Sequence, residues 1–287
     1  MSAREEIAAA AQLACLLEAS APKPGNVSPG VAFHDTRYED FLASAAAIAP
    51  AFLDAGEQPL GETILRAIEA TRSWTSANTN LGIVLLLAPL ARAAYLPQPE
   101  SLRDRVRTVL ASTTVADAVA VYRAIRLAQP GALGDASSQD IATSPTVTLT
   151  AAMTLAAERD DVAREYATGF ARTFTVAVPA LEQARADGLE WIDAVVESYL
   201  ALLADSPDTL IIRKLGPNAA EKVRSRAAEV RAAGAVRTDA GRRAIAAFDL
   251  ELRNSANSLN PGTSADIAAA AIFVVLLGRG RHGGLER

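Results

Sequence analysis

The sequence predicts an all-α protein, and three observations support this prediction. Half of the 287 residues are hydrophobic but only 5% are aromatic, and the most frequent residue is alanine, the best helix former. No segment alternates strictly between apolar and polar residues, as a half-buried strand would. Capping-box patterns precede apolar runs with helical spacing. We expect a single globular domain over residues 1–287, in which about twelve helices surround a buried apolar helix.

The helices of the N-terminal half are predicted from their caps and their apolar spacing. Ser2-x-x-Glu5 and Thr36-x-x-Glu39 are capping boxes and predict the starts of the first two helices. The run 81–95 is apolar on every face, which predicts a buried helix, and we expect Pro89 to kink it. The expected helices span 3–19, 37–53, 61–74, 81–95, 101–111 and 115–129.

Prolines and glycines punctuate the C-terminal half. Pro217 suits the first turn of a helix, and Gly234 suits the position after a helix end. Gly188 separates two amphipathic runs. The expected helices span 145–158, 162–186, 189–204, 208–215, 217–233, 239–252 and 264–278.

Composition excludes several classes of partner. The net charge of -5 leaves no broad basic field for a nucleic-acid backbone. Cys15 is the only cysteine, which excludes an internal disulfide and a multi-thiolate metal site. The apolar runs fall short of the roughly 20 residues that a bilayer span needs, and the N-terminus does not have a signal-peptide pattern. We therefore expect a cytoplasmic protein without nucleic-acid or membrane partners.

In an all-α protein, chemistry is expected where helices are interrupted, and the first interruption is Pro22–Asn26. Two prolines stiffen the chain around Lys23, which makes this lysine a candidate phosphate contact. Gly25 would let the backbone approach a ligand closely. An ordinary helix-ending turn is the alternative interpretation.

The second and third interruptions precede the helices expected at 81–95 and 145–158. Asn78, Thr79 and Asn80 would cap the buried helix or place an anion at its N-terminus. The loop 130–145 carries Asp135 and Asp140, whose carboxylates are suited to Mg²⁺, a hard cation. A solvated loop is the alternative for this segment.

The fourth interruption, Asn260–Asp266, opens the last apolar helix. Gly262, two hydroxyls (Thr263 and Ser264) and the free amides of a helix start would form a phosphate cradle. The segment is not a P-loop, because the Gly-Lys-Ser/Thr ending is missing. Asp266 lies beside an otherwise apolar helix start. The pair Arg213-Lys214 adds two cations before another helix start.

Three of these segments together carry a family resemblance. Pro22-Lys23-Pro24-Gly25-Asn26-Val27, Asn78-Thr79-Asn80-Leu81-Gly82 and Leu259-Asn260-Pro261-Gly262-Thr263-Ser264-Ala265-Asp266 occur in this order. The chain resembles the ATP:dephospho-CoA triphosphoribosyltransferases over nearly its whole length. The resemblance implies an all-helical enzyme that transfers the triphosphoribosyl group of ATP to the 2′-hydroxyl of 3′-dephospho-CoA and releases adenine. It also implies an acyl-carrier protein as a downstream partner of the product.

The implied reaction assigns roles to these residues. An inverting displacement at ribose C1′ needs a carboxylate near the developing positive charge and a base for the 2′-hydroxyl proton. We predict Asp35 as the base with Glu18 in reserve, and Asp140 and Asp266 as Mg²⁺ ligands. The predicted substrate contacts are Lys23, Gly25, Asn26, Asn78, Thr79, Asn80, Arg213, Lys214, Asn260, Gly262, Thr263 and Ser264.

The sequence also departs from the family pattern and leaves alternatives open. Citrate-lyase members usually read Asn-Thr-His-Lys-Gly where this chain has Asn78–Gly82, and Leu-Val-Asp where it has Asn26-Val27. One alternative is an ATP or nucleotide N-glycosidase that transfers to water. Another is a helical nucleotide-binding protein without turnover. A third, a Mg²⁺–diphosphate enzyme of the isoprenoid-synthase type, would rest on Asp160-Asp161, the only pair of adjacent aspartates.

Overall fold

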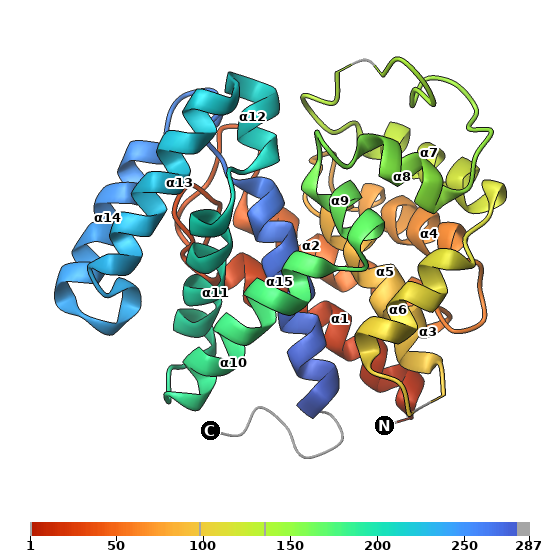
Figure 1. Ribbon diagram of the computed structural model, residues 1–287, viewed down its shortest axis with the longest axis horizontal. Helices are drawn as coiled ribbons and strands as arrows, with labels where there is room; N and C mark the ends of the chain where they lie inside the picture. Colours follow the sequence, from red (N-terminus) through yellow and green to blue (C-terminus); the bar gives the residue numbers. More distant parts are fainter. Residues whose placement is uncertain (1, 98, 135, 280–287) are drawn as a thin grey trace.

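A computed structural model describes residues 2–97, 99–134 and 136–279 of the chain. These residues form fifteen α-helices, one π-helix and one 3₁₀-helix, and they contain no strand beyond an isolated bridge between Ser28 and Val31. The all-α prediction is confirmed (Figure 1). The helices are α1 (Ala3–Ser20), α2 (Tyr38–Ala47), α3 (Ala49–Leu53), α4 (Leu60–Arg72), α5 (Leu81–Tyr95), α6 (Leu102–Ala111), α7 (Val115–Ala128), α8 (Leu149–Ala156), α9 (Asp161–Thr168), the π-helix η1 (Thr173–Ala177), α10 (Val178–Ala186), α11 (Trp191–Asp205), α12 (Thr209–Leu215), α13 (Pro217–Ala232), the 3₁₀-helix η2 (Ala235–Arg237), α14 (Asp239–Leu252) and α15 (Gly262–Arg279).

Two apolar helices, α5 and α15, form the centre of the molecule. The predicted burial of 81–95 is confirmed, but α15 shares the central position and packs against α1, α5, α10 and α11 (Figure 1). Residues 267–273 of α15 are all buried. Four successive alanines in this stretch let neighbouring helices approach closely, so the centre is dense although it holds few large side chains.

The helix α5 runs through Pro89 without a break, and a tyrosine explains how this is tolerated. A proline has no N–H, so Pro89 leaves the carbonyl of Leu85 without its helical donor. The hydroxyl of Tyr166, on α9, donates to that carbonyl at 2.6 Å. The buried acceptor is therefore satisfied from outside the helix.

Two predicted helices are divided. The segment 37–53 forms α2 and α3, with a break at Ile48 before Pro50. The segment 162–186 forms α9, η1 and α10, because Gly169 and Phe170 both have positive φ, 62° and 58°. Apolar periodicity continues across both breaks, so the spacing alone predicts longer helices than the chain forms.

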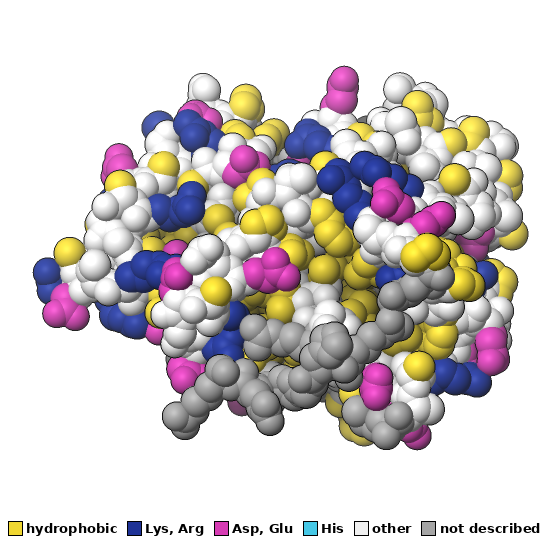
Figure 2. All heavy atoms as spheres, turned by 60° about the horizontal axis from the view of Figure 1, so that its bottom comes forward, with side chains coloured by type: hydrophobic (Ala, Val, Ile, Leu, Met, Phe, Trp, Pro, Cys, Tyr) yellow, Lys and Arg dark blue, Asp and Glu magenta, His cyan; other side chains and the backbone are white. Residues whose placement is uncertain are grey.

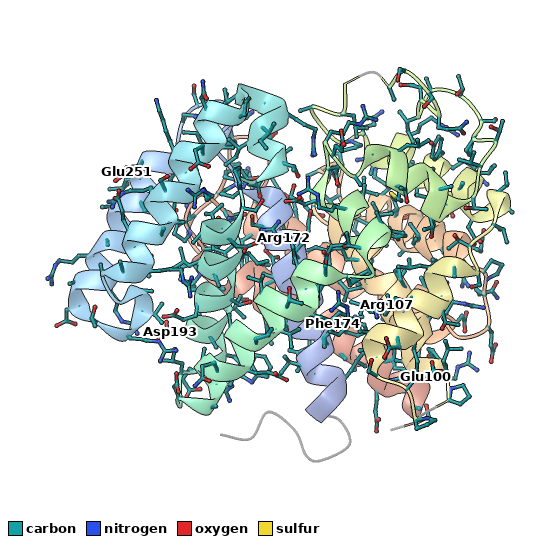
Figure 3. All side chains as sticks on the ribbon, in the orientation of Figure 1. Glu100, Arg107, Arg172, Phe174, Asp193 and Glu251 are labelled. Atoms are coloured by element: carbon teal, nitrogen blue, oxygen red, sulfur yellow. The ribbon has the colours of Figure 1, made fainter. Side chains whose placement is uncertain are left out.

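Opposite charges are interspersed on the molecular surface. On the face drawn in Figure 2, basic and acidic side chains lie next to one another. The outer helices carry ion pairs such as Arg242–Asp193 (2.6 Å) and Arg226–Glu251 (3.0 Å), and Figure 3 labels both acidic members there. Within the described residues, no individual helix has the length and apolar character to cross a bilayer. The pair α6–α7, bent by 98°, meets those criteria only when the two helices are taken together.

Candidate active site

One large cleft among the described residues brings the four interruptions together. Its volume is about 1160 Å³, and α1, α5, α12 and α15 border one part of it, whereas α7, α8 and α9 border the other. Pockets for one small ligand commonly measure roughly 300–1,000 Å³, so this cleft lies above that range. The predicted residues that line it are Glu18, Asn26, Asp35, Asn78, Thr79, Asn80, Arg213, Lys214, Asn260, Gly262, Thr263 and Asp266.

Two carboxylates, Glu18 and Asp266, form the acidic centre of the cleft. Glu18 lies near the C-terminal end of α1; its Oε1 pairs with Lys23, but its buried Oε2 has no hydrogen-bond partner among the described residues. Neither oxygen of Asp266 accepts a hydrogen bond from a described residue. Burial, followed by the negative charges of Glu18, Asp160 and Asp208, raises the pKa of Asp266 well above its ordinary range. These surroundings disfavour the charged form of Asp266, and a bound cation would favour it.

The start of α5 is shaped to accommodate Asp266. A Cβ atom added to Gly82 would overlap the carboxylate of Asp266. Gly82 is helical and has no unusual φ, so the requirement here is for space. A glycine is thus needed at position 82, because any side chain there would occupy the space of the Asp266 carboxylate at the start of α15.

Lys23 is not on the surface of the cleft. Its side chain is fully buried, and Nζ pairs with Glu18 Oε1 at 2.9 Å and donates to the backbone carbonyls of Glu18 and Ala21. The prolines of Pro22–Asn26 therefore turn the lysine inward. In this arrangement Lys23 holds Glu18 in place and does not present its charge to a phosphate.

Two asparagines, Asn26 and Asn260, join segments that are far apart in the sequence at one wall of the cleft. Asn260 Nδ2 donates to Asn26 Oδ1 (3.0 Å) and to the carbonyl of Gly25 (2.9 Å). Asn26 Nδ2 donates to the Tyr199 hydroxyl at 3.1 Å. Gly25 itself packs behind the wall, with φ of 76° and no room for a Cβ beside Leu252. It therefore allows close packing here and does not line the cleft.

The segment before α5 forms the second wall, and part of its polar capacity is used internally. Asn78 Oδ1 accepts from the backbone N–H of Leu81, the first residue of α5 (3.3 Å), whereas the N-cap residue Asn80 makes no side-chain cap. Asn80 Nδ2 donates to Thr71, and Thr79 shares a short hydrogen bond with Ser44. All three predicted residues still line the cleft, so capping and ligand contact are compatible.

Cations lie on α12 at one edge of the cleft. Arg213 pairs with Asp160 at 2.6 Å. Lys214 Nζ donates to the carbonyl of Asn257 (3.2 Å), and burial lowers its pKa against the opposing effect of Asp208 and Asp35. Asp35 lines the rim; its side chain is 63% exposed and lies 3.7 Å from His34.

Asp140 is engaged in its own loop. Its carboxylate accepts from the backbone N–H groups of Ala142 and Ala136, both at 2.8 Å, and these bonds lower its pKa. The described residues contain no group of three or more His, Cys, Asp or Glu side chains placed to hold a metal. The structure does not bring Asp140 to the cleft lining with Asp266, and Asp135 lies outside the described residues.

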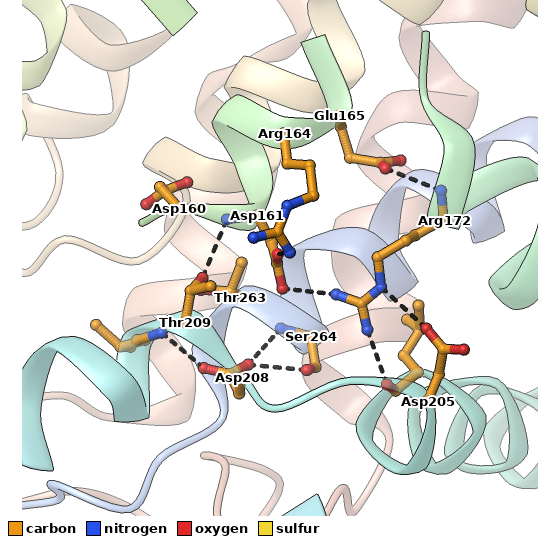
Figure 4. Close-up of polar contacts among 12 residues, drawn as sticks. Asp160, Asp161, Arg164, Glu165, Arg172, Asp205, Asp208, Thr209, Thr263 and Ser264 are labelled. Atoms are coloured by element: carbon orange, nitrogen blue, oxygen red, sulfur yellow. Dashed lines mark hydrogen bonds and ion pairs between the residues drawn. The ribbon is translucent and has the colours of Figure 1, made fainter. Parts of the chain in front are cut away.

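Ser264 faces away from the cleft, where a buried carboxylate joins two helices. Asp208 Oδ2 accepts from the backbone N–H and the hydroxyl of Ser264 at 2.7 and 2.8 Å (Figure 4). Asp208 Oδ1 accepts from Leu210 and Ile211 in the first turn of α12. One side chain thus caps α12 and fixes the start of α15.

Sequence reasoning missed the roles of Asp160, Asp208 and the ion pairs beside them. Asp161 is buried and pairs with Arg172 at 2.6 Å, and Figure 3 shows Arg172 near the centre of the fold. Figure 4 shows Asp160 and Asp161 beside Asp208. Asp160 and Asp208 are both N-caps, a position that a local pattern can predict. Their meeting at one site depends on tertiary packing.

Comparison with known proteins identifies the family. The family described as ATP:dephospho-CoA triphosphoribosyl transferase matches residues 4–284. The chain belongs to this family. The resemblance seen in the sequence is therefore confirmed.

Relatives of this triphosphoribosyl transferase family member include bacterial and archaeal proteins. The 2-(5''-triphosphoribosyl)-3'-dephosphocoenzyme-A synthase of Klebsiella pneumoniae is 31% identical over 106 residues, which is 37% of each chain. A protein of Pseudomonas syringae pv. syringae described by the same name is 27% identical over 76% of this chain and 68% of its own. A crystal structure from Archaeoglobus fulgidus, described as a triphosphoribosyl-dephospho-CoA synthase, has 31% identity and a TM-score of 0.64. That match covers 82% of this chain and 97% of the archaeal one.

Proposed function

We propose that this family member transfers the triphosphoribosyl group of ATP to the 2′-hydroxyl of 3′-dephospho-CoA and releases adenine. The observation that carries the proposal is the acidic centre, in which the free Oε2 of Glu18 and the carboxylate of Asp266 face a cleft of about 1160 Å³. The family and its named relatives support the same reaction. ATP acts here as a donor of a sugar group.

The acidic centre suits a transition state with positive charge at ribose C1′. When the bond from C1′ to adenine N9 breaks, the sugar becomes oxocarbenium-like. Glu18 is fixed by Lys23 and keeps one oxygen unpaired, so it offers a preorganised negative charge that needs little rearrangement. We assign Glu18 to this role and retain Asp35, at the rim, as the base for the 2′-hydroxyl proton.

Arg213 and Lys214 support the binding of the triphosphate. Both lie in the last turn of α12, and the N-terminal end of the 18-residue helix α15 borders the same cleft. A helix N-terminus carries partial positive charge and attracts phosphate groups. The partial burial of Lys214 disfavours its charged form, and a bound anion would compensate for this.

Mg²⁺ fits the residues present at Asp266. This carboxylate has no described hydrogen-bond donor and lies among other negative charges, which a divalent cation would neutralise. Mg²⁺ in nucleotide sites commonly uses one or two carboxylates and completes its shell with phosphate oxygens and water. When bound, the ion would offset the charge of the intact triphosphate. Asp140 is not assigned to it, because its oxygens cap the loop.

Mass spectrometry of the purified protein with ATP, Mg²⁺ and 3′-dephospho-CoA tests the proposal. We expect free adenine and an adduct of dephospho-CoA that carries one triphosphoribosyl unit, and we expect neither when any component is omitted. Equal adenine release without the acceptor would replace the transferase with a hydrolase. Binding of ATP without adenine release would contradict an enzymatic role. An acyl-carrier protein as recipient of the product remains part of the proposal.

A further inference from the structure

The cleft has a second part that the reaction centre does not use. This part lies toward α7 and α8, on the side of α9 that packs against α8 (Figure 1). Its lining includes many apolar side chains, together with polar ones such as Gln129, Ser137 and Gln139. We call this part the apolar lobe and define it by Tyr122, Ile125, Leu149, Met153, Ala156 and Val162.

The segments 129–134 and 136–148 border the apolar lobe and contribute Leu133 and Ile141 to its lining. The backbone of the second segment is held to α7, because the Tyr122 hydroxyl donates to the carbonyl of Gln139 (2.5 Å) and Arg126 donates to that of Ile141 (2.7 Å). The Gln139 side chain closes this segment through two bonds to Thr146, both 2.9 Å. The lobe is therefore a built compartment.

The shape of the acceptor indicates what this compartment holds. In 3′-dephospho-CoA the reacting 2′-hydroxyl and the adenine are on the same ribose, so both must lie near the acidic centre. The donor sugar and its adenine must lie there too. The pantetheine arm leaves from the other end of the acceptor, through the 5′-diphosphate, and is the only long, weakly polar part of either substrate.

The junction between the two parts of the cleft carries charges of both signs, because Asp160, which pairs with Arg213, lines it together with two arginines. Arg159 and Arg213 both line the cleft where α8 is followed by α9, and Arg213 donates to the backbone carbonyl of Arg159 at 3.1 Å. A diphosphate at this junction would lie near the guanidinium group of Arg159, a group that suits phosphate oxygens, while Arg213 stays with the triphosphate of the donor. The adenosine would then lie on the acidic side and the arm on the apolar side.

We propose that the apolar lobe is the subsite for the pantetheine arm of the acceptor. This inference rests on the proposed function for the identity of the acceptor. It assigns the preference for a CoA-type acceptor over a simple nucleotide to α7, α8 and the two segments that border the lobe. The donor site and the acidic centre are not involved in this preference.

Binding of 4′-phosphopantetheine, which is the arm without the adenosine, tests the inference by calorimetry. Ala156→Trp fills the lobe, and Ala151→Trp on the exposed face of the same helix is the matched control. We expect the wild type and the control to bind the probe equally, and Ala156→Trp to bind it at least about tenfold more weakly. The affinity for ATP should be the same in all three proteins.

A second variant covers the case in which Ala156→Trp fails to fold. Ile125→Ala enlarges the lobe and removes apolar contact. It should weaken the binding of 4′-phosphopantetheine about fivefold, again without changing the affinity for ATP. Absence of probe binding by the wild type, or an equal loss for ATP and the probe, would overturn the inference.

Adenine release separates this inference from the proposed function. Release that depends on dephospho-CoA but has the same KM for the acceptor in Ala156→Trp would refute the arm subsite and leave the transferase intact. Probe binding that Ala156→Trp abolishes, in a protein that releases no adenine, would support the subsite and refute the transferase. The expected result is a rise of about tenfold in the acceptor KM with the KM for ATP unchanged.

Discussion

The contact between Gly82 and Asp266 ties a backbone position on α5 to the chemistry of α15. Gly82→Ala would displace the carboxylate of Asp266, because the three atoms nearest to a Cβ at this position all belong to that carboxylate. We expect adenine release to fall by at least about tenfold, since small displacements in an active site have effects of this size or larger. Gly278→Ala is the control, because a Cβ there meets no atom within 4 Å. Full activity in Gly82→Ala would show that adenine release does not depend on the exact position of the Asp266 carboxylate.

The buried pair Glu18–Lys23 allows stability and activity to be separated. Glu18→Gln should lower kcat about 100-fold, because it removes the preorganised charge while preserving size. It should also cost about 3–5 kcal/mol of stability, since it leaves Lys23 buried without its partner.

The double variant Glu18→Gln/Lys23→Met distinguishes the two effects. It removes both charges, so urea denaturation should show much of the lost stability restored, while adenine release stays low. If activity returned together with stability, Glu18 would be only a structural partner of Lys23. If Lys23→Met alone raised the KM for ATP at unchanged stability, the original prediction of a phosphate contact would stand.

The break between α9 and α10 depends on one buried carboxylate. Glu165 accepts from the backbone N–H of Arg172 and of Thr173, both at 2.9 Å, and from the Thr173 hydroxyl at 2.5 Å. The positive φ of Phe170 interrupts the helix, so the first amides of the next helical segment have no carbonyl four residues earlier to donate to. Glu165 accepts their hydrogen bonds instead. Burial nevertheless raises the pKa of Glu165 above its usual 4.5.

This raised pKa predicts how stability changes with pH. The folded state holds the Glu165 proton more tightly than the unfolded state does, so its contribution is complete below pH 4.5 and declines as the pH rises through the folded pKa. Relative to Glu165→Gln, the wild type should therefore lose stability as the pH rises above 4.5, as measured by urea denaturation. A difference that stays constant or grows with pH would contradict the shift.

The support of α5 by Tyr166 makes a second prediction about a helix. Tyr166→Phe removes the hydroxyl that satisfies the carbonyl of Leu85 opposite Pro89. An unsatisfied buried acceptor costs about 1–3 kcal/mol, and thermal unfolding should show a loss of this size. Tyr38→Phe should cost less, because its partner is the partly buried Ser20 hydroxyl, which water can replace. Equal losses in the two variants would show that the Leu85 carbonyl finds another donor.

The sequence predicts most helices and the four segments that meet at the cleft. Caps, prolines and glycines are local signals, and they set where Asn78–Gly82 and Asn260–Asp266 interrupt the helices. The direction of a side chain is not local. Lys23 turns inward because its ammonium group pairs with the buried carboxylate of Glu18, five positions before it in the sequence. Asp140 is used by its loop because Ala136 and Ala142 present their amides to it.

The cleft joins helices from both halves of the chain, so substrate should stabilise the whole molecule. ATP with Mg²⁺ would contact α12 and α15 as well as the start of α5, and at 100 times its dissociation constant it should add about 2.7 kcal/mol to the free energy of unfolding. Thermal shift measurements should show a smaller effect for ATP with a chelator. The same shift with and without Mg²⁺ would contradict the assignment of the ion to Asp266.

The hydrogen bond between Asn26 and Asn260 also has a consequence for biosynthesis. It spans 234 positions of the chain, and α1 packs directly on α15 behind it. Pairings this distant form late, because a long loop must close before they gain any contact energy. During translation, the N-terminal helices are synthesised before α15. The apolar faces that pack against α15 are therefore exposed to solvent until α15 has been made. The cleft can therefore form only after α15 has been translated, and until then the exposed apolar faces favour aggregation.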